Sequence, residues 1–272
     1  MHQAKTLDGA LPDVVSEELA LPGSAWGVVA GPLISAVHEA RHLLWLTGGF
    51  ARDVIAGCAA EVNDLDLTGT APPGRFTELA RKVRRRSGLE FRTKVSPHSL
   101  VCSAQPPLGD ERLYEYRTLN SAKFGFQACG SDLEVDAGCR DFTVNSLYYD
   151  PVEDVVIDPT GQGLADLRAR PRRLASLKAT ENPLDQARIV LRAVKFAVRW
   201  EETTGYELCG TALSLARTPT TWDGLAAKEW ELLSGDHHRG MHGCDVGRQM
   251  RVATALGPGA AELFATLLEV RL

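Results

Sequence analysis

The feature that most constrains the fold is a short apolar run that passes directly into two glycines. Residues 43–47 read Leu-Leu-Trp-Leu-Thr, which is typical of a buried strand, and Gly48 and Gly49 follow before a helical pattern over residues 50–57. A strand, a glycine turn and a helix in this order let backbone N–H groups approach an anion such as a phosphate. The sequence therefore predicts a strand–turn–helix unit that is a candidate phosphate site, with a tight structural turn as the alternative.

A pair of aspartates lies on the next predicted strand, around residues 65–68. Asp64 and Asp66 are two residues apart, so on a strand both carboxylates point to one face, about 7 Å apart along the chain. Such a pair can hold divalent cations about 3.5–4 Å apart for in-line phosphoryl or nucleotidyl displacement. Exposed strands and turns use the same spacing without a metal. Arg52 could reach a triphosphate from the helix or could pair with Asp53.

The pattern changes after Asp158-Pro159, where strand signals end and helical spacing continues to the C-terminus. Before that point, a Pro-Gly turn precedes a basic helix, and three strand-like runs follow; these segments are residues 72–74, 76–86, 89–95, 99–104 and 113–119. We predict an α+β head domain over residues 1–170 and an all-helical domain over residues 171–272.

The composition excludes several classes of protein. The chain has 272 residues, of which 44% are hydrophobic and 24% charged, as in ordinary globular proteins. A net charge of −5 argues against a generally cationic nucleic-acid coat. Arginines far outnumber the seven lysines, which indicates either phosphate binding or a GC-rich genome. Without a visible signal peptide, a membrane-length apolar run or a Cys-x-x-Cys pair, the sequence predicts a cytoplasmic protein with reduced thiols.

Two clusters remain open. His237, His238, His242 and Cys244 could bind zinc, but the spacing favours a polar, glycine-rich loop between helices. The basic run over residues 81–86 is either an RNA-contacting patch or, more often for such runs, a solvated helix face.

Four motifs then follow one another in a fixed order along about residues 40–200. They are Gly-Gly-Phe-Ala-Arg-Asp at 48–53 with Asp-Leu-Asp-Leu-Thr at 64–68, Asp-Ala-Gly-Cys-Arg-Asp-Phe-Thr-Val-Asn at 136–145, Ile-Asp-Pro-Thr-Gly-Gln-Gly-Leu-Ala-Asp-Leu at 157–167, and Leu-Arg-Ala-Val-Lys-Phe-Ala at 191–197. Together they resemble the class II tRNA nucleotidyltransferase (CCA-adding enzyme) and bacterial poly(A) polymerase family. The resemblance implies a polymerase-β-like nucleotidyltransferase head, a mixed sheet with helices, followed by an all-helical neck-like domain.

The resemblance also implies a set of roles. Asp64 and Asp66 would hold two Mg²⁺ ions, and Glu115 is a candidate third catalytic carboxylate, with a cross-strand salt bridge as its alternative. Asp136 and Asn145 either order the motif around Arg140 or brace the fold. The predicted nucleotide-binding residues are Gly48, Gly49, Arg52, Asp136, Arg140, Asp185, Arg188, Arg192 and Lys195.

The predicted helix over residues 185–199 supports a nucleotide site without the resemblance. Its charged residues fall within an arc of about 80°, and the rest of its circumference is apolar, so the charged seam should be partly enclosed. Enclosed cations need acceptors, and the helix offers one acid against four bases, which favours a bound anion over internal salt bridges. By the resemblance, Asp185 and Arg188 would read the base of CTP or ATP.

The sequence departs from the family in several places. Cys139 replaces an arginine, Lys195 replaces another, and Arg188 lies four residues before Arg192 instead of three. Only about 70 residues follow Arg199, where family members continue into domains that grip tRNA.

The resemblance implies an Mg²⁺-dependent nucleotidyltransferase. It would transfer CMP or AMP from CTP or ATP to a hydroxyl acceptor with release of pyrophosphate. The resemblance implies that the acceptor is a tRNA-like RNA 3′ end, with no membrane partner. A small-molecule acceptor is the alternative, and a non-catalytic nucleotide- or RNA-binding module is the second.

Overall fold

The computed structural model describes residues 10–21, 24, 26–88, 90–96, 101–106, 112–120, 130–177, 180–219, 222–241 and 243–269. The chain divides into two compact units. The first comprises Met1–Arg140 and Val144–Leu164, and the second comprises Asp141–Thr143 and Ala165–Leu272. The main division thus falls at residues 164/165, and a three-residue segment from the middle of the chain belongs to the second unit.

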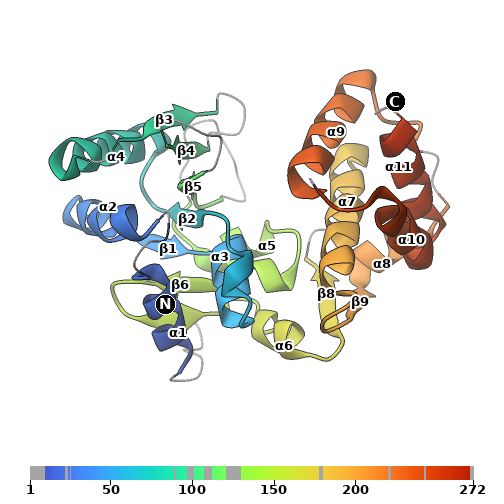
Figure 1. Cartoon of the computed structure of the whole chain (residues 1–272), viewed down its shortest axis with the longest axis horizontal. Coiled ribbons are helices and arrows are strands. Elements are labelled where there is room, and N and C mark those ends of the chain that lie inside the picture. The colour runs from blue at the N-terminus through green and yellow to red at the C-terminus, as the bar shows by residue number, and fades with distance from the viewer. Residues whose placement is uncertain are drawn as a thin grey trace. The chain divides into compact units, whose positions relative to one another are not determined.

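The first unit is built on a mixed seven-stranded sheet with the strand order β3-β4-β5-β2-β1-β6-β7 (Figure 1). β2 and β5 are parallel, and the other neighbouring strands are antiparallel. The strands are β1 (Leu44–Leu46), β2 (Leu65–Gly69), β3 (Arg92–Val95), β4 (Cys102–Gln105), β5 (Tyr114–Thr118), β6 (Tyr148–Asp150) and β7 (Val155–Ile157). The helices are α1 (Leu11–Leu19), α2 (Gly27–Glu39), α3 (Gly48–Ile55), η1 (Ala59–Glu61), α4 (Pro73–Ser87) and α5 (Leu133–Gly138).

Alternation along β5 determines which face of the sheet α4 covers. Tyr114 and Tyr116 are buried, and Phe76 of α4 stacks on Tyr116 at 3.6 Å between ring centroids and meets Tyr114 edge-on at 5.7 Å. Burying each ring contributes on the order of 1.5–3 kcal/mol. Because successive side chains of a strand point to opposite faces, Glu115 lies on the face that α4 does not cover.

Helix α2 begins earlier than its sequence pattern indicates. In the sequence, helical spacing of apolar residues is clear only over residues 34–41, whereas α2 begins at Gly27 and continues through Pro32. A proline inside a helix costs a hydrogen bond. Here the buried face made by Val29, Leu33 and Val37 supplies the packing that offsets this cost.

The second unit is mainly helical, as predicted, and it also contains a two-stranded parallel sheet that the sequence did not predict. β8 buries Arg172 and Leu174, and β9 buries only Leu208, so neither strand produces an apolar run. Its elements are α6 (Gly163–Arg168, which crosses the division), β8 (Arg172–Ser176), α7 (Pro183–Trp200), β9 (Tyr206–Cys209), α8 (Gly210–Arg217), α9 (Ala227–Met241), α10 (Val246–Leu256) and α11 (Pro258–Glu269).

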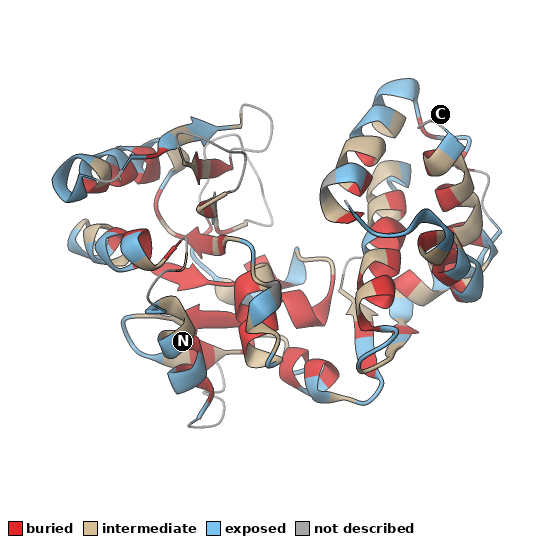
Figure 2. Ribbon diagram, viewed as in Figure 1, coloured by how far each residue is buried: buried red, intermediate tan, exposed pale blue. Residues whose placement is uncertain are grey.

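Helix α7 is the core of the second unit, and Figure 2 shows buried residues along most of its length. Asn182 caps it by accepting a hydrogen bond from the Asp185 N–H at 3.1 Å. Within the described part of the chain, no helix has the length and hydropathy needed to cross a membrane.

Candidate functional site

Two carboxylates meet where the parallel strands β2 and β5 pair. Asp66 is the direct partner of Glu115, so both side chains lie on the face that α4 leaves uncovered. Burial and then the negative charge of Glu115 raise the pKa of Asp66, while the Gly49 N–H and the charges of Arg52 and Arg140 act in the opposite direction. The strand register thus brings together two of the predicted catalytic carboxylates.

The glycine turn adjoins Asp66. Thr47 is extended, Gly48 has φ of 59°, and the Gly49 N–H donates to Asp66 Oδ2 at 2.5 Å. A Cβ atom would lie 2.7 Å from Asp66 Oδ2 at Gly48 and 2.9 Å from it at Gly49, closer than real Cβ contacts. Both positions need glycine because the Asp66 carboxylate approaches the backbone here. The Gly49 N–H, which the sequence analysis offered to a phosphate, donates to Asp66 instead.

Arg112 joins the remaining carboxylate to this pair. Its Nε lies 3.9 Å from Asp64 Oδ2, and its Nη1 donates to Glu115. Arg117 adds a second contact, with 3.4 Å between its Nη2 and Glu115 Oε1. Glu115 therefore forms salt bridges, but with bases of its own segment instead of the cross-strand bridge considered from the sequence. Arg112 carries no motif that could have singled it out.

The donor chemistry of these residues fits a hard divalent cation. Asp64, Asp66 and Glu115 offer carboxylate oxygens, which Mg²⁺ prefers. Burial and, after it, the charge of Glu115 raise the pKa of Asp66, and a bound cation would act against both effects. In the residues that the structure describes, no three acidic, histidine or cysteine side chains are grouped as a metal site; Arg112 supplies the positive charge beside Asp64 and Glu115.

Arg52 is buried and bound on three sides within the first unit. Its Nε and Nη2 donate to the two carboxylate oxygens of Asp53 at 2.8 and 2.7 Å, and its Nη1 donates to Asn145 Oδ1 at 2.6 Å. Its Nη2 lies 3.7 Å from where a Gly49 Cβ would be. Arg52 thus forms the ion pair with Asp53 that the sequence analysis named as the alternative to contact with a triphosphate.

A second buried network surrounds Arg140. Asp136 accepts from Arg140 Nη2 at 2.9 Å, from the Tyr148 hydroxyl at 2.7 Å and from the Asn120 N–H at 2.7 Å. Burial alone would raise the pKa of Asp136, but the charge of Arg140 and these hydrogen bonds lower it. Tyr148 also accepts from Arg140 Nε at 2.9 Å. The network fixes the Arg140 guanidinium, and no sequence pattern indicated that Tyr148 and Asn120 take part.

The other predicted nucleotide-binding residues lie on α7, in the second unit. Arg188 Nε donates to Asp236 of α9 at 3.0 Å, and Arg192 pairs with Asp141. Asp185 and Lys195 are partly exposed. The expectation that α7 bases lack acidic partners is wrong for Arg188 and Arg192, because the acids come from other segments and not from the helix itself.

The histidine cluster is helical at its start. Helix α9 continues through His237 and His238 to Met241, so the predicted loop does not begin at these residues. His237 is buried, shares a hydrogen bond of 2.6 Å between its Nε2 and Gln249 Oε1, and packs edge-on against Phe264. His238 and Cys244 are exposed, and His242 lies outside the described residues. His237 therefore contributes to core packing.

Comparison with known proteins matches residues 44–173 to the family described as the Poly A polymerase head domain. Poly(A) polymerase I of Escherichia coli is 31% identical over 169 residues, which are 60% of this chain and 35% of that protein. A CC-adding tRNA nucleotidyltransferase of Geobacter sulfurreducens is 31% identical over 194 residues, 69% of this chain and 39% of its own. The chain thus spans between a third and two fifths of the length of these relatives.

Solved structures show the same fold. A CCA-adding enzyme in apo form II superposes with a TM-score of 0.60 at 18% identity, covering 89% of this chain and 55% of that one. The Bacillus stearothermophilus CCA-adding enzyme in complex with CTP gives a TM-score of 0.57 at 18% identity, covering 86% and 54%. The segment from residue 44 to residue 173 is thus similar to poly(A) polymerase head domains.

Proposed function

We propose that this chain is an Mg²⁺-dependent nucleotidyltransferase that moves CMP or AMP from CTP or ATP to the 3′-hydroxyl of an RNA. The observation that carries the proposal is the register of β2 and β5, which sets Asp66 opposite Glu115 beside the glycine turn of α3. The names of the relatives, a poly(A) polymerase and a tRNA nucleotidyltransferase, support the reaction class and an RNA acceptor.

The residues of the first unit divide the work of nucleotidyl transfer. Asp64, Asp66 and Glu115 would hold Mg²⁺, which supplies charge neutralisation for in-line displacement at the α-phosphorus. Gly48 and Gly49 let the Asp66 carboxylate approach the turn, so this ligand would hold Mg²⁺ beside the backbone that faces the triphosphate. Arg140, oriented by Asp136 and Tyr148, presents a fixed cation to the nucleotide. The acceptor oxygen bonds to the α-phosphorus, its proton is lost, and pyrophosphate leaves.

The helix α7 would select the base. Arg188 is held by Asp236, and Asp185 lies one turn before it on the same helix. A guanidinium and a carboxylate at this spacing can pair with the edge of a cytosine or an adenine, worth about 1–3 kcal/mol of discrimination.

Within the described residues, the five cysteines are free thiols, which supports a reducing compartment such as the cytoplasm.

The proposal is tested by incubating the full chain with Mg²⁺, each α-labelled NTP, and either tRNA lacking its 3′ end or a metabolite extract. We expect label on RNA and release of pyrophosphate, and a loss of more than about 10³-fold in rate for Asp64→Asn and Asp66→Asn, because the transition state loses charge stabilisation. Asp13→Asn, at an exposed position of α1, is the matched control and should retain activity.

Each other outcome changes the proposal. Label on a small molecule and none on RNA would replace the acceptor. Absence of pyrophosphate with every acceptor, together with nucleotide binding that Asp66→Asn leaves unchanged, would show a binding module instead of an enzyme.

A further inference from the structure

Positive charge is concentrated in one short stretch of this acidic protein. Residues 75–94 contain eight bases and two acids, whereas the whole chain has 30 bases and 35 acids. The rest of the chain therefore carries eleven more acids than bases. A local excess of this size creates a positive potential that the net charge conceals.

Helix α4 turns most of these bases to solvent. Its buried face packs on the sheet through Phe76, Leu79 and Val83, and the bases at 81, 82, 85 and 86 are exposed. Two contacts join this face to strand β3: Arg81 Nε donates to Thr93 Oγ1 at 3.4 Å, and Arg84 Nη1 donates to the Phe91 carbonyl at 3.0 Å. The basic face of α4 is thus continuous with the edge of the sheet.

Strand β3 extends the charge to the other face of the sheet. Lys94 pairs with Ser103, Ser103 with Glu115, and Glu115 with Asp66, so these four side chains share one face. Arg92, two residues before Lys94, shares that face, whereas Thr93 lies on the α4 side. Bases therefore lie on both faces of the sheet at its edge strand, and Lys94 lies in the same row as Glu115 and Asp66.

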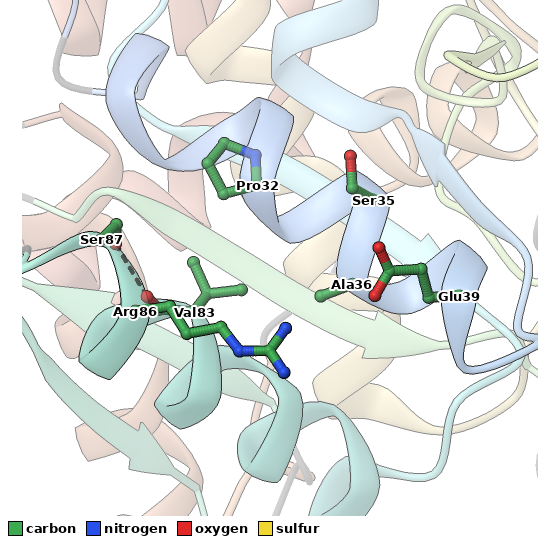
Figure 3. A pocket seen from close by; sticks show the side chains of 7 residues that line it. All are labelled: Pro32, Ser35, Ala36, Glu39, Val83, Arg86 and Ser87. Carbon is green, nitrogen blue, oxygen red and sulfur yellow. Dashed lines mark hydrogen bonds between the residues drawn. The ribbon is translucent and has the colours of Figure 1, made fainter.

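The helix α2 forms the border of this surface. Figure 3 shows a groove between α2 and α4, with Arg86 on one wall and Glu39 and Ser35 on the other. Its volume of about 220 Å³ is below the roughly 300–1,000 Å³ of typical small-molecule sites. The groove is therefore too small to be the reason for the bases.

Stability does not account for this arrangement. Bases in the last turn of a helix favour its dipole, and charges protect an edge strand, but neither effect explains Arg81 and Lys82. Arg81 and Arg85, and likewise Lys82 and Arg86, are four residues apart, where like charges repel by about 0.2–0.5 kcal/mol per pair. No carboxylate among the described residues forms an ion pair with these four bases.

The chemistry of the surface fits a nucleic-acid backbone. Phe76 and Phe91 are buried, and the described residues of α4 and β3 expose no aromatic ring on which a base could stack. Contacts would therefore be made to phosphates and would be independent of sequence. Val95, 37% exposed, is the one large apolar side chain exposed among the described residues of α4 and β3, which disfavours insertion into a membrane.

We propose that Arg81, Lys82, Arg85, Arg86, Arg92 and Lys94, here named the edge-strand surface, bind the phosphates of the acceptor RNA as it leaves the site at Asp66 and Glu115. The proposal rests on the proposed function for its choice of RNA. Three strand spacings of about 4.8 Å separate Lys94 from Asp66, or about 14 Å, the rise of about four stacked nucleotides. Acceptors shorter than this cannot reach the surface.

The test compares two triple variants of equal charge. Lys82→Gln/Arg85→Gln/Arg92→Gln removes three bases of the edge-strand surface, and Arg217→Gln/Lys228→Gln/Arg251→Gln removes three exposed bases elsewhere. Binding of a labelled 20-nucleotide oligoadenylate is measured without NTP at several salt concentrations. The first variant should reduce the slope of log K against log salt by about 2 and raise Kd roughly tenfold or more near 0.1 M salt. The second should change the slope by much less.

A kinetic arm separates this surface from the chemistry. With a 20-nucleotide acceptor, the first variant should raise KM about tenfold at unchanged kcat, and with a 3-nucleotide acceptor neither constant should change. If no transfer occurs with any protein but the slope still falls, the surface is supported and the proposed function fails.

Three results would overturn the proposal. They are an unchanged slope in the first variant, an equal change in the control variant, and loss of binding to vesicles with about 30% phosphatidylserine while RNA binding is kept. The last result would assign the surface to an anionic membrane.

Discussion

Asp66 lies where burial and a neighbouring carboxylate disfavour its ionised form. Burial and Glu115 raise its pKa above that in the unfolded chain, so this group favours the folded state below the unfolded pKa, and that contribution is lost as the pH rises through the folded pKa. Asp66→Asn should therefore raise Tm at pH 7–8, by about 2–4 °C for each kcal/mol in a chain of this size, and the gain should vanish toward pH 4. Thermal unfolding at a series of pH values measures this.

Mg²⁺ provides the internal control for Asp66. A ligand that binds the folded state raises Tm, so Mg²⁺ should stabilise the wild type and have little effect on Asp66→Asn. A mutant that is less stable than the wild type at pH 8 would contradict the assignment of uncompensated charge to this site.

Tyr148 is expected to matter through its hydroxyl alone. The ring packs against Trp45 and Leu119, while the hydroxyl donates to Asp136 and accepts from Arg140. Tyr148→Phe leaves two buried charged groups short of a partner and should lower the free energy of unfolding by about 1–3 kcal/mol.

Urea denaturation measures this loss, and Tyr149→Phe is the control. The Tyr149 hydroxyl bonds to the exposed Asp154, where water replaces it, so that variant should cost less than about 1 kcal/mol. Equal losses in the two variants would argue against the network.

At this scale the sequence predicted groups that lie close along the chain. Asp64 and Asp66 are two residues apart at the start of β2, so spacing alone suggested that pair, whereas the family resemblance suggested that Asp136 orders the motif around Arg140. Tyr148 and Arg112 come from segments whose side-chain directions are set only when strands pair, and the sequence did not predict their roles. The sequence also did not indicate Asp141 and Asp236 as partners of α7, because only the packing of other segments against that helix brings them to Arg192 and Arg188.

Among the elements, the start of α3 requires glycine at position 48 for two reasons that can be tested separately: a positive φ and the close approach of Asp66. Gly48 has φ of 59° and would place a Cβ 2.7 Å from Asp66, whereas Gly57, after the same helix, has φ of 72° and open space around it. Gly57→Ala should therefore cost only the backbone strain, about 1–2 kcal/mol, and Gly48→Ala should cost more and also displace the carboxylate.

The comparison is made by urea denaturation and by the Mg²⁺-dependent shift in Tm. Gly57→Ala should keep that shift and Gly48→Ala should lose it. If the two alanine variants behaved alike, the close approach of Asp66 would not be the reason for the glycine.

Elements with an apolar run or clear helical spacing were predicted well. β1 and β5 lie within the segments that their patterns indicated, and β2, α4 and α7 cover theirs and extend one to three residues beyond them. The strands β8 and β9 were not predicted, because each buries few side chains and finds its partner across the whole of α7. β8 and β9 form because they pair with each other over a long sequence separation, and a local sequence pattern does not contain that information.

At the scale of the molecule, the second unit depends on a segment that precedes most of it. Phe142 is fully buried and meets Phe196 of α7 edge-on at 5.8 Å, and the Leu177 N–H donates to the Asp141 carbonyl at 3.1 Å. Phe142→Ala should lower stability by about 3–5 kcal/mol through the cavity that it leaves.

Amide hydrogen exchange would locate this effect. Phe142→Ala should accelerate exchange along α7, and Phe50→Ala, which leaves a cavity of similar size in the first unit, should accelerate exchange in α3 and not in α7. Uniform acceleration in both variants would show that the two units open together.

Because Phe142 precedes Phe196 in the sequence, the ribosome adds Phe142 well before the ring against which it packs. Phe196 is added 54 residues later, which at about 5–20 residues per second takes roughly 3–11 s. The strands β6 and β7 of the first unit are completed within that interval. For several seconds of every round of translation, an aromatic ring that the finished protein buries completely is without the ring it packs against, and it is then most exposed to wrong apolar partners.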